Sequence, residues 1–147
     1  LMGIAMVAGA LAYGPADRLF PSRKWMILGG TAVTLLAGVW LIVMPAQSLF
    51  LSVILLCVIG FFGMTYPVVM AHGRSFLPPH LIGRGVTLLN LFSIGGVGVA
   101  QFVSGRVYRA ALPAETAAGP YVAVFILFTA MLAVGFAIYL FSRDQQD

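Results

Sequence analysis

Four long runs of uncharged, mostly apolar residues limit what this chain can fold into. They cover residues 25–44, 49–71, 85–105 and 121–141. Each run has about the 20 residues that a helix needs to cross a hydrocarbon core of about 30 Å. The runs are continuously apolar, whereas a strand of a membrane barrel alternates apolar and polar residues over about ten positions. The pattern therefore predicts four membrane-spanning helices.

The composition excludes a water-soluble monomer. Hydrophobic residues make up 61% of the chain and charged residues only 8%, against about 25% charged residues in an average soluble domain. The eight Lys and Arg residues are scattered through short connectors and do not form the clustered basic face of a nucleic-acid binder. We therefore expect a lipid bilayer, and no nucleic acid, as a partner.

Prolines and Gly-Pro pairs in the connectors set the limits of the predicted helices, because proline stops a helix or starts one. The first apolar segment is too short to span a bilayer, so we expect it to be the tail of a longer, truncated helix. The predicted fold class is an all-α integral membrane protein with four complete transmembrane helices and one partial helix. The spans are expected at residues 1–14 (partial), 25–44, 49–71, 84–108 and 120–141.

The distribution of basic residues predicts the orientation of the helices, because the more basic side of a membrane protein faces the cytoplasm. The first connector, the third connector and the tail carry six basic residues, and the other side carries Arg106 and Arg109. We therefore expect a multi-pass protein of a cell inner membrane with a cytoplasmic carboxyl terminus. The six residues are Arg18, Arg23, Lys24, Arg74, Arg84 and Arg143.

A polar stripe follows one face of the span at 84–108. Its members are separated by 3, 4, 4 and 3 residues and are Asn90, Ser93, Val97, Gln101 and Ser104. An amide without a partner in hydrocarbon costs several kcal/mol, so this face is expected to meet protein or water. Two interpretations are open: a stripe that lines a polar path, or hydrogen bonding between helices.

The preceding span has a second set of residues near one face, namely Ser52, Gly63, Tyr66 and Met70. Pro67 is expected to kink or loosen this helix toward its cytoplasmic end. The alternative to a functional face is simple packing.

Small residues recur at a spacing of four on three predicted helices, which is typical of close helix contacts in bilayers. The alternative for each ridge is a face toward lipid. The ridges are Gly30-Thr34-Gly38, Gly96-Ala100-Ser104 and Thr129-Ala133-Ala137.

Signatures of enzymes and metal sites are missing from the sequence. Ionisable groups inside membrane spans usually mark proton relays. No Asp, Glu, Lys, Arg or His lies in the middle of a complete span of this sequence. His72 and His80 are expected to be solvated residues of the third connector. We expect no enzymatic activity, no catalytic or metal-binding residue and no cofactor.

The connectors resemble those of the last third of a major facilitator superfamily transporter. The stretch 14–25, with Gly14, Asp17, Arg18, Arg23 and Lys24, is similar to the cytoplasmic signature of that family, and here it would join helices eight and nine. The stretch from Tyr66-Pro67 through 83–85 to Asn90 is similar to the connector between helices ten and eleven of many bacterial members. The resemblance covers essentially the whole chain.

The resemblance implies a place in a six-helix half-bundle and a role for two sets of residues. It implies that Asp17, Arg18, Arg23 and Lys24 form a cytoplasmic gate, for which the alternative is a role in topology alone. Helices ten and eleven would line a central cavity, and nine and twelve would lie outside. The cavity set is then Ser52, Gly63, Tyr66, Asn90, Ser93 and Gln101.

The function implied is transport of a small solute by alternating access, with the amino-terminal half of the polypeptide as the missing partner. A fragment of this kind is expected to be inactive alone. The alternative is a small stand-alone membrane scaffold or assembly subunit, in which the polar stripes serve partner helices.

Overall fold

A computed structural model describes residues 1–19, 22–45, 48–112 and 116–142, with the backbone alone for 17–19. Every regular element within these ranges is a helix. In chain order they are α1 (Met2–Leu19), α2 (Arg23–Val43), α3 (Leu49–Phe62), α4 (Tyr66–Ser75), the short 3₁₀ helix η1 (Pro79–Leu81), α5 (Ile82–Ala110) and α6 (Gly119–Leu140).

Four helical stretches are long and apolar enough to cross a membrane, which agrees with the expected class and number of spans. They are Arg23–Val43, Leu49–Ser75, Pro79–Ala110 and Gly119–Leu140. The hydroxyls of Ser22 and Ser48 cap α2 and α3 by accepting from the backbone N–H three residues later, each at 3.3 Å. The stretch Pro79–Ala110 begins with Pro79, which cannot lie inside an uninterrupted helix without losing a hydrogen bond.

The expected stop at Gly14-Pro15 is wrong, because α1 continues through Pro15 to Leu19. Proline removes one hydrogen bond from a helix, but the turns on either side keep theirs, and apolar membrane helices tolerate this loss.

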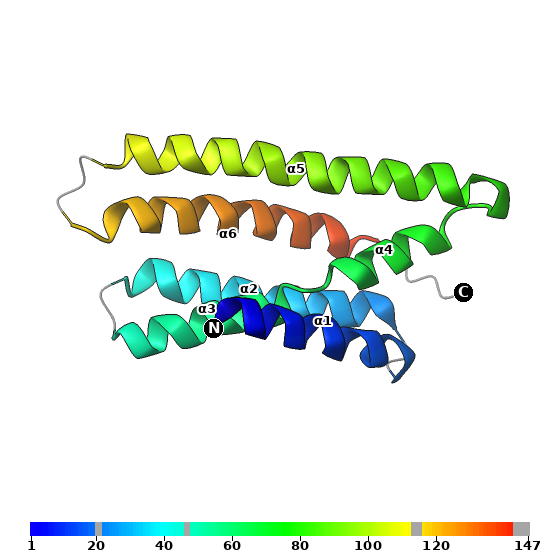
Figure 1. Cartoon of the computed structure of the whole chain (residues 1–147), viewed down its shortest axis with the longest axis horizontal. Helices are drawn as coiled ribbons and strands as arrows, with labels where there is room; N and C mark the ends of the chain where they lie inside the picture. Colours follow the sequence, from blue (N-terminus) through cyan, green and yellow to red (C-terminus); the bar gives the residue numbers. More distant parts are fainter. Residues whose placement is uncertain (20–21, 46–47, 113–115, 143–147) are drawn as a thin grey trace.

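The helices lie side by side in one bundle (Figure 1). α2 lies between α3 and α6, α1 packs on α3, and α5 is the outermost helix, against α6 and α4. The ends of α1, α4 and α6 lie at the same end of the bundle as the starts of α2 and α5. The small core therefore forms where α1, α2 and α4 meet, around Tyr13, Ile27 and Val68.

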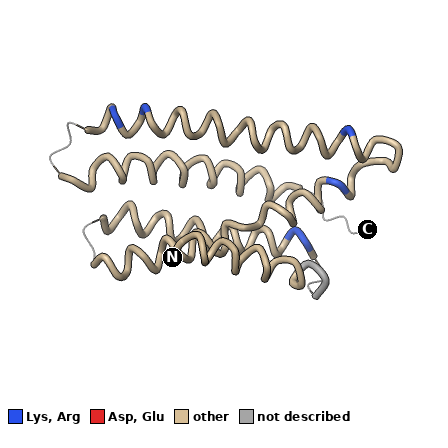
Figure 2. The backbone as a smooth tube through the Cα atoms, viewed as in Figure 1, with Lys and Arg blue, Asp and Glu red and all other residues tan. Residues whose placement is uncertain are grey.

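Basic residues divide between the two ends of the bundle (Figure 2). Arg23, Arg74 and Arg84 lie at one end together with Lys24, and Arg106 and Arg109 lie at the other. We call the first of these the basic end. This grouping agrees with the prediction that the first and third connectors lie on one side and Arg106 and Arg109 on the other. Arg143 and the side chain of Arg18 lie outside the described residues.

Candidate functional site

The third span, counting the partial first one, is the stretch Leu49–Ser75, and it is broken in two near the middle of the bundle. α3 ends at Phe62, residues 63–65 form turns, and α4 begins at Tyr66 with Pro67 in its first turn. Proline is favoured there because the first N–H groups of a helix have no partner within it. At about 1.5 Å per residue, the 14 residues of α3 rise about 21 Å, so the break lies within the expected hydrocarbon depth.

Several backbone carbonyls at the break have hydrogen-bond partners inside the protein, which backbone groups need at bilayer depth. The Ile59 carbonyl accepts from the N–H of Gly63 at 2.8 Å, and the Thr65 carbonyl accepts from Val68 and Val69, each at 3.0 Å. The Phe62 carbonyl accepts from the hydroxyl of Tyr13 on α1, at 3.1 Å. A side chain from another helix therefore replaces a hydrogen bond that the broken helix lacks.

Glycine on α2 makes room for that tyrosine. A Cβ on Gly30 would lie 2.2 Å from the Tyr13 hydroxyl oxygen and 3.1 Å from the Phe62 carbonyl oxygen. Gly30 itself is buried. α1 and α2 therefore cover one side of the break, which could not keep this geometry with a larger residue at position 30.

Two of the predicted cavity residues meet beside the break. The hydroxyl of Tyr66 donates to Oδ1 of Asn90, at 2.5 Å, and so joins α4 to α5. Tyr66 is 44% exposed and Asn90 is half-buried. The pair contains neutral hydrogen-bonding groups only, and it can bind uncharged polar groups.

The other predicted cavity residues are spread along the bundle. Gly63 is exposed at the break, whereas Ser52 lines a pocket with Pro45 and Tyr121 at the end opposite the basic end. Ser93 is half-buried, and Gln101 is exposed without a side-chain hydrogen bond to any described residue. The structure therefore brings Gly63, Tyr66 and Asn90 together, and it does not bring Ser52 or Gln101 to them.

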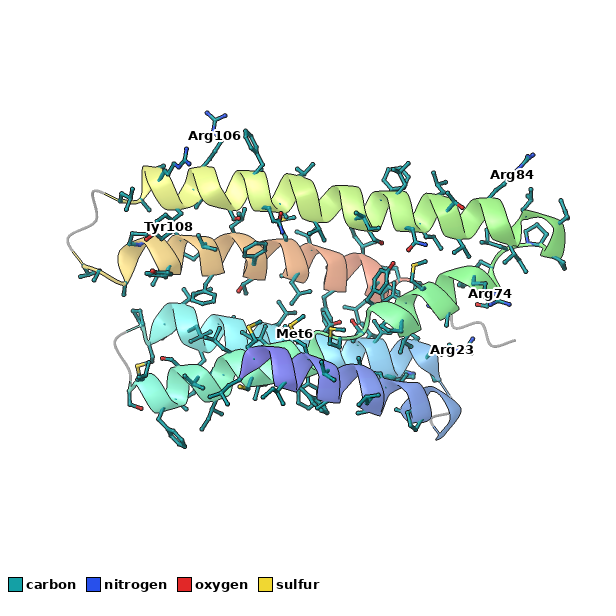
Figure 3. The ribbon with its side chains drawn as sticks, in the orientation of Figure 1. Met6, Arg23, Arg74, Arg84, Arg106 and Tyr108 are labelled. Atoms are coloured by element: carbon teal, nitrogen blue, oxygen red, sulfur yellow. The ribbon has the colours of Figure 1, made fainter. Side chains whose placement is uncertain are left out.

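Of the predicted gate residues, Lys24 has a defined contact. Its ammonium donates to the carbonyls of Leu140 and Ser142, at 2.8 Å and 2.7 Å, and so binds the carboxyl end of α6 to the start of α2. A cation at this position also complements the negative end of the α6 dipole. Arg23 lies beside it at the basic end (Figure 3). The side chains of Asp17 and Arg18 lie outside the described residues.

His72 is not the solvated connector residue that we expected, and it is 3% exposed. Its Nδ1 forms a hydrogen bond with the hydroxyl of Tyr139 on α6, and its ring packs edge-on against Phe76. The expectation was wrong because α4 continues to Ser75 and carries His72 inward. His72 follows Val68 by four residues, so both lie on the buried face of α4, and this spacing was a usable signal. His80 is exposed, as expected.

Metal-binding groups do not gather in the described part of the chain. No three His, Cys, Asp or Glu side chains approach one another there. Cys57 is a half-buried free thiol on α3. The described polar groups of the site are therefore hydroxyl, amide, imidazole and ammonium groups.

No protein-family model, no curated protein and no solved structure matches this chain. What the molecule does must therefore be inferred from its own residues.

Proposed function

We propose that the chain is the carboxyl-terminal part of a secondary transporter of the major facilitator type, which moves a small solute across a bacterial inner membrane by alternating access. The observation that supports this most is the broken third span with the polar pair beside it. Secondary transporters commonly build their sites from interrupted helices near the middle of the bilayer. A break at this depth requires enclosed partners for its carbonyls, and α1 supplies one through Tyr13.

In this proposal, the wall of the solute path runs from the break along the polar face of α5. Tyr66 and Asn90 would contact the solute beside the break, and Gln101 would face water farther along α5, toward the end opposite the basic end. The exposed amide of Gln101 supports a wet surface, because an amide facing hydrocarbon is strongly unfavourable. The gate would include Lys24, whose bonds to the end of α6 would break when the bundle rocks.

Cysteine accessibility tests the proposal. In the protein in native membranes, with Cys57 replaced by Ala, we expect a membrane-impermeant maleimide to label Gln101→Cys and Asn90→Cys. The matched control is Val99→Cys, because Val99 lies on the same helix at nearly the same depth and is 65% exposed. It lies about 200° around the helix from Gln101 and should face lipid.

Two outcomes would contradict this assignment. Equal labelling of Gln101→Cys and Val99→Cys would show that water does not select one face of α5. Labelling of neither, with disulfide cross-linking of Gln101→Cys to a second protein, would favour the scaffold or assembly subunit. A detergent-solubilised sample labelled at all three positions controls for thiol reactivity.

A further inference from the structure

An apolar cavity of about 450 Å³ lies between α1, α2 and α3, near the basic end. Its volume falls in the range of small-molecule pockets, about 300–1,000 Å³. Aliphatic and aromatic carbons line it, including those of Met26 and Phe61. The hydroxyl of Tyr13, which also lines it, is already used by the carbonyl of Phe62. The cavity therefore suits a hydrocarbon ligand.

Small residues keep the cavity open. Ala12 and Ala16, one turn apart on α1, and Gly29 on α2 contribute little volume to its lining. A Cβ on Gly29 would meet no heavy atom within 4 Å. An empty apolar space loses the dispersion contacts that close packing supplies, so a flexible hydrocarbon chain would gain contacts by filling it.

The rim of the cavity has the groups that hold a lipid at a membrane surface. Trp25, in the first turn of α2, lines the cavity and is 68% exposed. Tryptophan is enriched at the level of lipid headgroups. The cavity therefore reaches from hydrocarbon depth to the interface at the basic end.

Charge at that end favours an anionic headgroup. Arg23 and Lys24 directly precede Trp25, and the described charged side chains at the basic end are all cationic. Among the residues whose side chains are not described, Asp17 and Arg18 have opposite charges, and the tail contains Arg143, Asp144 and Asp147. The ammonium of Lys24 has three N–H donors, of which two bind the carbonyls at the end of α6. One remains for a phosphate oxygen.

We infer that this cavity binds one acyl chain of an anionic phospholipid, whose phosphate lies against Arg23 and Lys24. The inference uses the packing of α1, α2 and α3 and does not depend on transport. A lipid bound here would fill the cavity beside the break and hold the start of α2 in one leaflet of the bilayer.

The test is lipid binding by the purified chain in detergent, measured by native mass spectrometry with added phosphatidylglycerol or phosphatidylcholine. Gly29→Phe fills the cavity and should weaken phosphatidylglycerol binding about tenfold, or about 1.4 kcal/mol. Gly95→Phe is the matched control, because a Cβ on Gly95 also meets nothing within 4 Å but this residue lies on α5, away from the cavity. Equal binding by the two variants would overturn the inference.

Two further measurements keep the result interpretable. Gly29→Leu, with a smaller side chain, should give an intermediate loss, and circular dichroism should show unchanged helix content in both Gly29 variants. For the headgroup, Arg23→Gln should reduce the preference for phosphatidylglycerol over phosphatidylcholine about threefold or more, and Arg84→Gln at the same end should not. A wild-type chain that binds both lipids equally would overturn the headgroup assignment.

Discussion

The central helix α2 and the outermost helix α5 differ in how closely they contact the rest of the bundle. α2 has six buried residues, Ile27, Leu28, Gly30, Ala37, Gly38 and Leu41. α5 is eight residues longer and has none. Both helices are apolar enough to span a membrane. Apolar composition therefore places a helix in a bilayer, and it does not place the helix inside the protein.

The predicted ridges of small residues show the same difference. In the ridge Gly30-Thr34-Gly38 the two glycines are close contacts, because a Cβ on Gly30 would lie 2.2 Å from Tyr13 on α1 and one on Gly38 would lie 2.6 Å from Thr129 on α6. A Cβ on Gly96 would meet nothing within 4 Å. Thr129 is the residue that contacts Gly38, but Ala133 and Ala137 are exposed. A small residue allows close approach, and a contact forms only where a partner helix is present.

The largest expected effect is at the close approach of α1 to α3. A Cβ on Gly9 would lie 2.3 Å from the carbonyl oxygen of Phe61, which is backbone and cannot move aside. We expect Gly9→Ala to lower the free energy of unfolding by about 1–3 kcal/mol, as overpacking does. Gly96→Ala, the matched control on α5, should leave it unchanged or raise it by up to about 1 kcal/mol, because alanine favours helix. Unfolding in mixed detergent micelles, followed by circular dichroism, measures both, and equal effects would contradict the contrast.

A smaller effect is expected where α1 meets α2. Gly30→Ala would displace the Tyr13 hydroxyl and break its bond to Phe62, and Tyr13→Phe would remove the same bond at a cost of about 1 kcal/mol. Tyr13→Phe also removes the closest atom, while the Cβ would still lie 3.0 Å from Cγ2 of Thr65 and 3.1 Å from the Phe62 carbonyl oxygen. The double variant should therefore lose less stability than the sum of the two single variants. A double-mutant cycle of unfolding free energies measures the coupling. Strictly additive losses would mean that the two residues do not share this contact.

The smallest expected effect is that of Tyr66→Phe on the outer side of the bundle, and the same substitution at Tyr139 is its comparison. Tyr139→Phe removes the hydroxyl bonded to Nδ1 of the buried His72, which should cost about 1–2 kcal/mol because this buried nitrogen loses a hydrogen bond. Tyr66→Phe removes an exposed partner of Asn90 on α5, so water can replace it and the loss should stay below about 1 kcal/mol. The same unfolding assay ranks the two. A larger loss for Tyr66→Phe would show that the interface of α4 with α5 is as enclosed as the core.

Some of the site could be predicted from local sequence and some could not. Pro67 predicts an interruption of the third span because its ring and missing N–H act on the adjacent turn, and the observed break lies just before it. The role of Tyr13 was not predicted, because its partner Phe62 is 49 residues away in the chain. The bond of Lys24 to the end of α6 spans an even larger separation, of 116 and 118 residues, and no local pattern encodes it.

The sequence by itself determined the helical class, the four apolar spans and the grouping of basic connectors, because these depend on composition and on periodicity within short segments. Only the tertiary structure decided which glycines are contacts, that His72 is buried and that α1 completes the hydrogen bonding of a broken helix. Those features depend on which helices meet. Contacts between helices in a bilayer are made by shape and by individual hydrogen bonds, and the apolar character that all the spans share does not select among them.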